Sequence, residues 1–385
     1  NLLLGESQTT IIGSANNTNE IRSRRGRGWF GGQNAGITAS ENLGVNTNID
    51  LTGKLDKKDD KTELLLGGDA TLNHSVNDTR TQSQKESYSE EATYIDQDST
   101  NKVTHAWDAQ MRLEMEYQID SMNKVILRPQ ISYSNSRYAQ TNDYTYERDS
   151  VLINDGYQNQ SSLQEEISAA IRATYNHKFA KPGRSLTMRA NVTFKNTKGE
   201  TDTYAFDNLT NAALVDQNTL SHNNALSYSL RTSFVEPIYG KNHFIETVLS
   251  LSGSNRNSVK DQYSMDSITG NYEYDSVYSN ALTNDMYTEQ LELNYRWVSE
   301  KMDLTAGARV LATQTHSTTY YGNTLARDTL YNRWNWSPNV RFRYKFGQKE
   351  FARVVYRGRV NQPTIQQIEP VRNNSDAMNE TVGNL

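Results

Sequence analysis

The sequence contains no cysteine, only six prolines and no long apolar run. The absence of cysteine excludes disulfides, thiolate metal sites and cysteine nucleophiles together. No segment approaches the ~18 consecutive apolar residues that a membrane-spanning helix needs. The net charge of −5 argues against binding to nucleic acid through overall positive charge, so nucleic acid is not an expected partner.

The chain also lacks an initiator methionine and a basic-then-apolar leader at its start. It begins at Asn1, inside what reads as the end of a strand over 2–4. We interpret the sequence as a single domain, residues 1–385, truncated at both ends. Low overall hydrophobicity is compatible with a transmembrane β-barrel, because only alternate residues of its strands face lipid and polar loops dilute the rest.

Apolar and polar side chains alternate over long stretches, which predicts strands with one apolar and one polar face. In the clearest stretch, apolar residues at every second position from Trp107 to Ile119 are separated by polar residues, among them Arg112 and Glu114. The pattern recurs over 186–194, 291–297 and 334–346, and more weakly over 45–52. We expect an all-β, antiparallel transmembrane barrel whose apolar faces contact lipid. Soluble β-sandwiches or solenoids are the alternative, but sandwich strands are shorter and no fixed repeat is visible.

The predicted connections are of two kinds. Short ones are expected at 120–124, 180–184, 240–242, 300–302 and 347–349, and long polar ones near 16–35, 82–104, 142–161, 207–224, 266–283 and 321–332. Short periplasmic turns and long extracellular loops are typical of outer-membrane barrels. About thirteen strands are predicted, and an odd number leaves edges unpaired, so the barrel is expected to be incomplete. Strands longer than a bilayer requires predict a β-collar, and Pro129 and Pro338 predict a bulge or an irregular stretch.

No constellation typical of catalysis is present. The six histidines are scattered, none in a zinc-protease spacing, and no nucleophile elbow or phosphate-binding loop occurs. We therefore expect a protein that is not an enzyme and that uses no cofactor or metal.

The arginines interleaved with the apolar positions are expected to line the barrel interior. The candidates are Arg112, Arg189, Arg296, Arg341, Arg343, Arg353 and Arg357. Either they form a charge network along a wet wall, which we favour, or they form a basic band that holds a plug domain or guides an anionic solute. In the predicted outer loops, Trp29, Tyr144, Tyr146, Tyr274 and Tyr320 are candidate ligand contacts, with simple loop filling as the equal alternative.

The two ends of the chain carry specific sequence motifs. Residues 356–370 read Tyr-Arg-Gly-Arg-Val-Asn-Gln-Pro-Thr-Ile-Gln-Gln-Ile-Glu-Pro, and an asparagine-rich stretch leads to Gly383-Asn384-Leu385. Near the start, Ile12-Gly13-Ser14 is followed by a Gly/Arg-rich loop. These motifs resemble the barrel of TonB-dependent-receptor-like outer membrane proteins of Bacteroidota.

The resemblance implies an outer-membrane location, a barrel of about twenty-two strands, outer-membrane lipid around it, an N-terminal plug domain and coupling to the TonB complex. A surface lipoprotein is a further expected partner. The leading hypothesis is import of a bulky nutrient, namely an oligosaccharide, a peptide or a metal chelate. The alternative is a structural or adhesive barrel whose extracellular loops bind partners.

Overall fold

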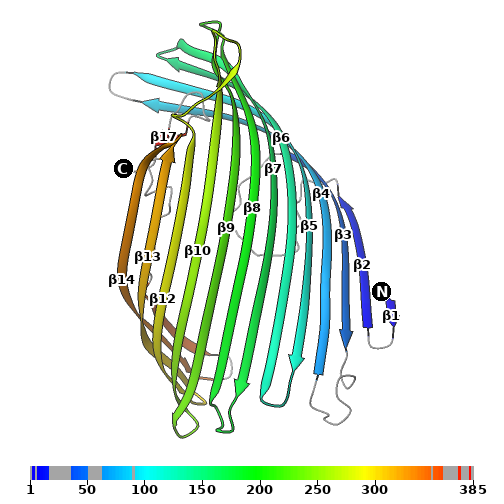
Figure 1. Ribbon diagram of the computed structural model, residues 1–385, viewed down its shortest axis with the longest axis vertical. Coiled ribbons are helices and arrows are strands. Elements are labelled where there is room, and N and C mark those ends of the chain that lie inside the picture. The colour runs from blue at the N-terminus through cyan, green and yellow to red at the C-terminus, as the bar shows by residue number, and fades with distance from the viewer. Residues whose placement is uncertain are drawn as a thin grey trace.

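A computed structural model describes residues 2–4, 7–16, 36–50, 63–88, 92–347, 350–358, 372–373 and 381–382. Within these residues the chain is almost entirely strand (Figure 1). The strands are β1 (Leu2–Leu4), β2 (Ser7–Asn16), β3 (Gly36–Asp50), β4 (Glu63–Tyr88), β5 (Thr93–Gln118), β6 (Asn123–Arg148), β7 (Val151–Lys178), β8 (Ser185–Asp207), β9 (Ala212–Tyr239), β10 (His243–Met265), β11 (Tyr272–Tyr274), β12 (Asn280–Val298), β13 (Met302–Tyr321), β14 (Thr324–Lys345), β15 (Phe351–Arg357), β16 (Arg372–Asn373) and β17 (Thr381–Val382). The described part contains no helix long and apolar enough to cross a membrane.

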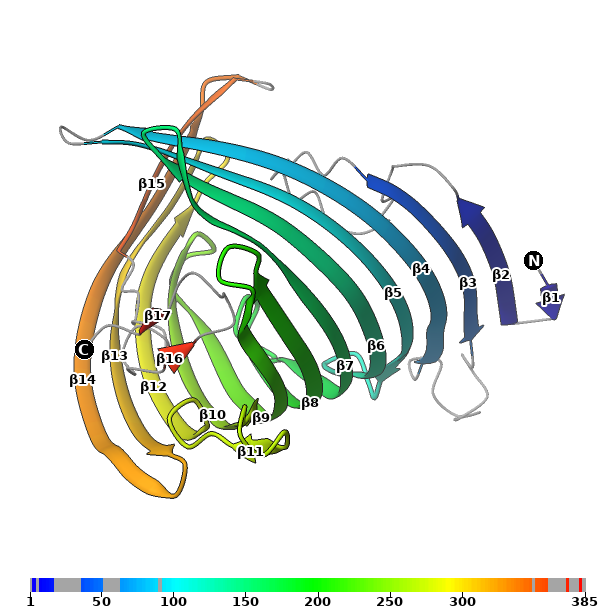
Figure 2. The ribbon, with the colours of Figure 1, turned by 90° about the horizontal axis from the view of Figure 1, so that it is seen from above.

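Strands β1 to β15 form one antiparallel, 15-stranded sheet in which β11 pairs only with β10. Each of the others pairs with its sequence neighbour, as expected for strands joined by hairpins. Seen from above, the sheet curls into an open trough that bends most tightly over β10 to β14 (Figure 2). Among the described residues, β1 and β15 do not pair with each other, so the barrel is not closed. The prediction of an incomplete antiparallel barrel is confirmed.

The connections differ from the prediction at the collar end. The predicted short turns lie at one end, for instance between β5 and β6 and between β12 and β13. At the opposite end, most segments predicted as long loops are strand: β6 continues to Arg148 and β7 begins at Val151. Asp149 and Ser150 connect them with φ of 51° and 66°, the left-handed pair that a type I′ hairpin requires. The segment 16–35 lies almost entirely outside the described residues.

The two prolines predicted to disturb strands, Pro129 and Pro338, leave the registers around them intact. At Pro129 the ladder between β5 and β6 is interrupted from Arg112–Gln130 to Met115–Leu127, and the same register resumes beyond it. This is an irregular stretch without a bulge, and it agrees with the lost ladder hydrogen bond. Pro338 pairs with Ala308 in an unbroken register, so no bulge forms there.

The outer face carries a band of exposed apolar side chains with aromatic residues at its limits. On β12, Leu291 and Leu293 are 54% and 55% exposed, and they lie between Tyr287 and Trp297. The span from Tyr287 to Trp297 matches the ~9–11 residues with which a tilted strand crosses the hydrocarbon. Aromatic rings at such limits are typical of membrane interfaces. This face is therefore the lipid-facing surface.

Candidate functional site

The predicted arginines lie on the face opposite the apolar band. Residues that pair directly across an antiparallel ladder project from the same face, and alternate residues of a strand do as well. Arg189 pairs with Arg231, and Arg343 pairs with Arg353. By the same rule all seven predicted arginines belong to the concave inner face. Their direct pairing also places like charges side by side, which destabilises a sheet unless opposite charge compensates them.

On the wall formed by β4, β5 and β6, charges of opposite sign neutralise one another. Arg112 Nε lies 3.3 Å from a carboxylate oxygen of Asp69. Arg128 Nη2 donates to Glu114 at 2.6 Å, and Lys124 Nζ donates to Glu116 at 2.7 Å. These chains are part-exposed and contribute about 0–1 kcal/mol per pair. This wall is the charge network that the sequence analysis favoured.

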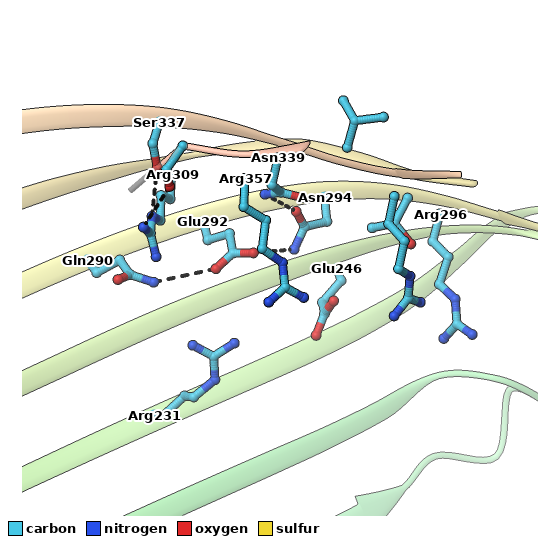
Figure 3. Close-up of a pocket in the computed structure, with 14 residues that line it drawn as sticks. Arg231, Glu246, Gln290, Glu292, Asn294, Arg296, Arg309, Ser337, Asn339 and Arg357 are labelled. Atoms are coloured by element: carbon cyan, nitrogen blue, oxygen red, sulfur yellow. Dashed lines mark hydrogen bonds between the residues drawn. The ribbon is translucent and has the colours of Figure 1, made fainter. Parts of the chain in front are cut away.

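The wall formed by β9 to β15 is organised differently. A hollow of about 510 Å³ lies on its inner face. The charged residues that line it are Arg231, Glu246, Glu292, Arg296, Arg309, Arg341 and Arg357. Figure 3 shows most of these side chains, among them Arg231, Glu292 and Arg357, projecting from the ribbons into one space. Five guanidinium groups thus face two carboxylates, within a chain whose net charge is −5.

Charged side chains of this hollow form hydrogen bonds to neutral groups rather than to one another. Arg309 donates from Nε to Ser337 Oγ at 2.7 Å and from Nη2 to the Gly358 carbonyl at 3.2 Å. Glu292 accepts a hydrogen bond from the side-chain amide of Asn294 at 2.8 Å. Figure 3 marks this hydrogen bond and the one from Arg309 to Ser337. The ion pair between Arg341 and Asp303 on the inner face is long, with 3.8 Å from Nη2 to the carboxylate oxygen. The charges therefore remain directed at the lumen.

A glycine allows two strands that are not neighbours to meet across this wall. Asn339 on β14 donates to Asn294 Oδ1 on β12 at 3.1 Å, over Gly307 on the intervening β13. A Cβ at Gly307 would lie 2.2 Å from that Oδ1 and 2.3 Å from the Leu293 carbonyl oxygen. Only glycine fits there. The bridge also orients Asn294 toward Glu292.

Sequence reasoning missed Arg309 and Glu246 as wall residues. The outward positions beside Arg309 are Ala306, Ala308, Val310 and Ala312, whose small side chains produce weak alternation. Glu246 follows the strand start at His243, where the pairing with β9 shifts register beside Pro237. The strand register identifies both residues, because Arg309 pairs with Glu292 and Glu246 pairs with Asn294 on the inner face of β12.

The aromatic candidates do not form one site. Tyr144 and Tyr146 belong to β6 rather than to a loop; Tyr144 is buried beside Gly156, and Tyr146 stacks on Tyr94 at 5.8 Å. Tyr320 likewise belongs to β13, on its outer face. The loop prediction was wrong because collar strands are polar on both faces and show no hydropathy contrast.

Tyr274 belongs to β11 and packs edge-on against Tyr263 at 5.8 Å. Its neighbour Tyr272 donates to Asp216 at 2.6 Å, and this bond raises the pKa of Tyr272 to about 12. Trp29 lies outside the described residues. The tyrosines thus hold the collar strands together at separate places.

Comparison with known protein families decides what kind of sheet this is. Residues 177–385, more than half of the chain, match the outer membrane protein beta-barrel family. The chain belongs to this family. Its location is therefore the outer membrane, as the lipid-facing band requires. A search of curated proteins found no match. Membership establishes the barrel and its membrane and leaves the transported or bound ligand to be argued from the wall.

Proposed function

We propose that the protein is a TonB-dependent importer of a bulky nutrient: an oligosaccharide, a peptide or a metal chelate. The observation that carries the proposal is the unbroken path of strands, β1 to β15 without β11. A barrel that contains so many strands encloses a lumen wide enough for a large solute. The sequence motifs at both ends, which resemble TonB-dependent receptors of Bacteroidota, support the same function.

A lumen of this width would leak unless another element fills it. A plug domain within the full-length protein is the element proposed here, with the TonB complex as the energy source. The inner wall offers hydrogen-bonding and charged groups to both the plug and the solute. A surface lipoprotein could meet the collar, since strands of 26 to 28 residues such as β5 and β7 extend well beyond the bilayer.

The test uses the full-length protein in its own bacterium. A deletion strain is grown with an oligosaccharide as carbon source, a peptide as nitrogen source or a ferric chelate as iron source. Import is supported if the deletion strain fails to grow on one of these nutrients and the intact gene restores growth. The intact gene should not restore growth in a strain that also lacks TonB. Normal growth on all three, together with no binding of the purified protein to the TonB periplasmic domain, overturns it.

The second candidate is an adhesive or structural barrel. The collar favours it, because β6 and β7 continue beyond the apolar band as a paired hairpin that a partner could contact. The same deletion strain separates the two functions: loss of surface attachment with unchanged nutrient uptake supports adhesion.

A further inference from the structure

The two walls of the trough treat charge in opposite ways. On β4 to β6, acid and base touch at 2.6 to 3.3 Å, so little field remains for a ligand. On β8 to β15, the inner face carries Arg189, Arg231, Arg296, Arg309, Arg341, Arg343, Arg353 and Arg357 against Glu246, Glu292 and Asp303. By the same pairing rule Arg256, Lys260 and Arg333 also belong to this face, so its cations outnumber its carboxylates and an excess of positive charge remains.

We propose that the hollow on β9 to β15 binds a multivalent anionic group, a carboxylate or a phosphate, that a solute presents from the lumen. This inference deepens the proposed import and rests on it for the identity of the ligand as a transported solute. The size of the hollow, about 510 Å³, is within the range of small-molecule pockets.

Two of the guanidinium groups are held in position for such a ligand. Arg309 is fixed by a hydroxyl and a backbone carbonyl, which leaves its positive charge uncancelled while its position is set. Arg231 donates to the Ser250 hydroxyl at 3.3 Å. A planar guanidinium matches carboxylate and phosphate oxygens in bidentate geometry. Positioned arginines bound to neutral groups therefore lose little conformational freedom when an anion arrives.

A further atom of the hollow lacks a partner. Thr305 Oγ1 is buried and makes no hydrogen bond among the described residues, and Thr305 lines the hollow beside Arg296 and Arg341. A buried polar atom without a partner costs free energy that a bound ligand oxygen can recover. The two carboxylates, Glu246 and Glu292, bond to a serine hydroxyl and to amides, so they do not occupy the arginines.

Citrate and inorganic tripolyphosphate are the two probes for the experiment. Each is titrated by calorimetry into the full-length protein, purified in detergent at low salt. We expect saturable binding of at least one probe, which weakens as salt screens the charges. Arg231→Gln and Arg357→Gln should each weaken it about tenfold, which corresponds to a loss of about 1.4 kcal/mol of binding free energy.

Arg128→Gln is the matched control, because it removes the same charge from the self-neutralised wall. Its affinity should stay within about twofold of the wild type, since Arg128 already pairs with Glu114. Binding of citrate alone assigns a carboxylate ligand, and binding of tripolyphosphate alone assigns a phosphate. Binding of neither probe, or equal loss in the control, overturns the proposal.

Arginine modification provides a readout that needs no variant. Phenylglyoxal should modify Arg231 and Arg357 more slowly when the bound probe is present, as mapped by mass spectrometry. Unchanged modification rates at both residues contradict the assignment even if a variant fails to fold. None of these measurements involves TonB, so a failure of import leaves the binding result intact, and the reverse also holds.

Discussion

Gly307→Ala is expected to destabilise the barrel and to disturb the hollow at once. The new methyl group would lie 2.2 Å from Asn294 Oδ1 and 2.3 Å from a backbone oxygen of Leu293, so β12 and β13 must separate. Overpacking of this kind costs about 1–3 kcal/mol. Loss of the 3.1 Å hydrogen bond from Asn339 adds roughly 0.5–1.5 kcal/mol. The total is on the order of 2–4 kcal/mol.

The assay is the temperature at which the detergent-purified barrel loses its heat-modifiable gel mobility. Gly307→Ala should lower this temperature clearly, while Gly347→Ala should leave it nearly unchanged. A Cβ at Gly347 meets only a carboxylate oxygen of Glu350, at 3.9 Å. Equal stability of the two variants would refute the argument that β12 and β14 are bridged over Gly307. Anion binding should weaken in Gly307→Ala too, because the amide that orients Glu292 is displaced.

Three further outcomes are expected. Leu291→Lys on the lipid face should cost about 2–4 kcal/mol in folding free energy, whereas Gln290→Lys on the lumen face should cost much less; equal costs would reverse the assignment of faces. The pKa of Asp120, in the turn after β5, is lowered by hydrogen bonds, first from the Asn123 side chain. The ionised carboxylate therefore stabilises the fold above the ordinary carboxyl pKa, and this stabilisation is lost as the pH falls. The wild type should melt at a higher temperature than Asp120→Asn at neutral pH, and the difference should vanish in acid. A difference that grows in acid contradicts the prediction. Tyr272→Phe should speed amide hydrogen exchange in β11, and unchanged exchange would show that its hydroxyl does not anchor that strand.

Most of the membrane-level architecture follows from the sequence alone. Within the bilayer one face of each strand contacts lipid and the other contacts water. The alternation around Trp107 and Leu291 therefore predicts both that these segments are strands and which side chains face the lipid. The short turns are equally readable, because they interrupt this pattern abruptly. The same rule of alternation assigns the seven arginines to the concave face.

The collar and the division of the inner wall could not be predicted. Above the bilayer both faces of a strand meet water, so Tyr144 and Tyr146 gave no hydropathy signal and were assigned to loops. The contrast between the two walls depends on register, which alternation does not determine. Arg112 lies beside Asp69 only because β4 and β5 pair as they do, and Arg231 faces Arg189 for the same reason.

The long strands set the height at which the cell first meets a ligand. β7 has 28 residues, of which a bilayer crossing needs about eleven. The remainder, at about 3.3 Å per residue and a barrel tilt of about 40°, rises on the order of 40 Å above the lipid. The rim of the barrel therefore stands well clear of the lipid, and a large solute or partner can contact it without approaching the membrane surface.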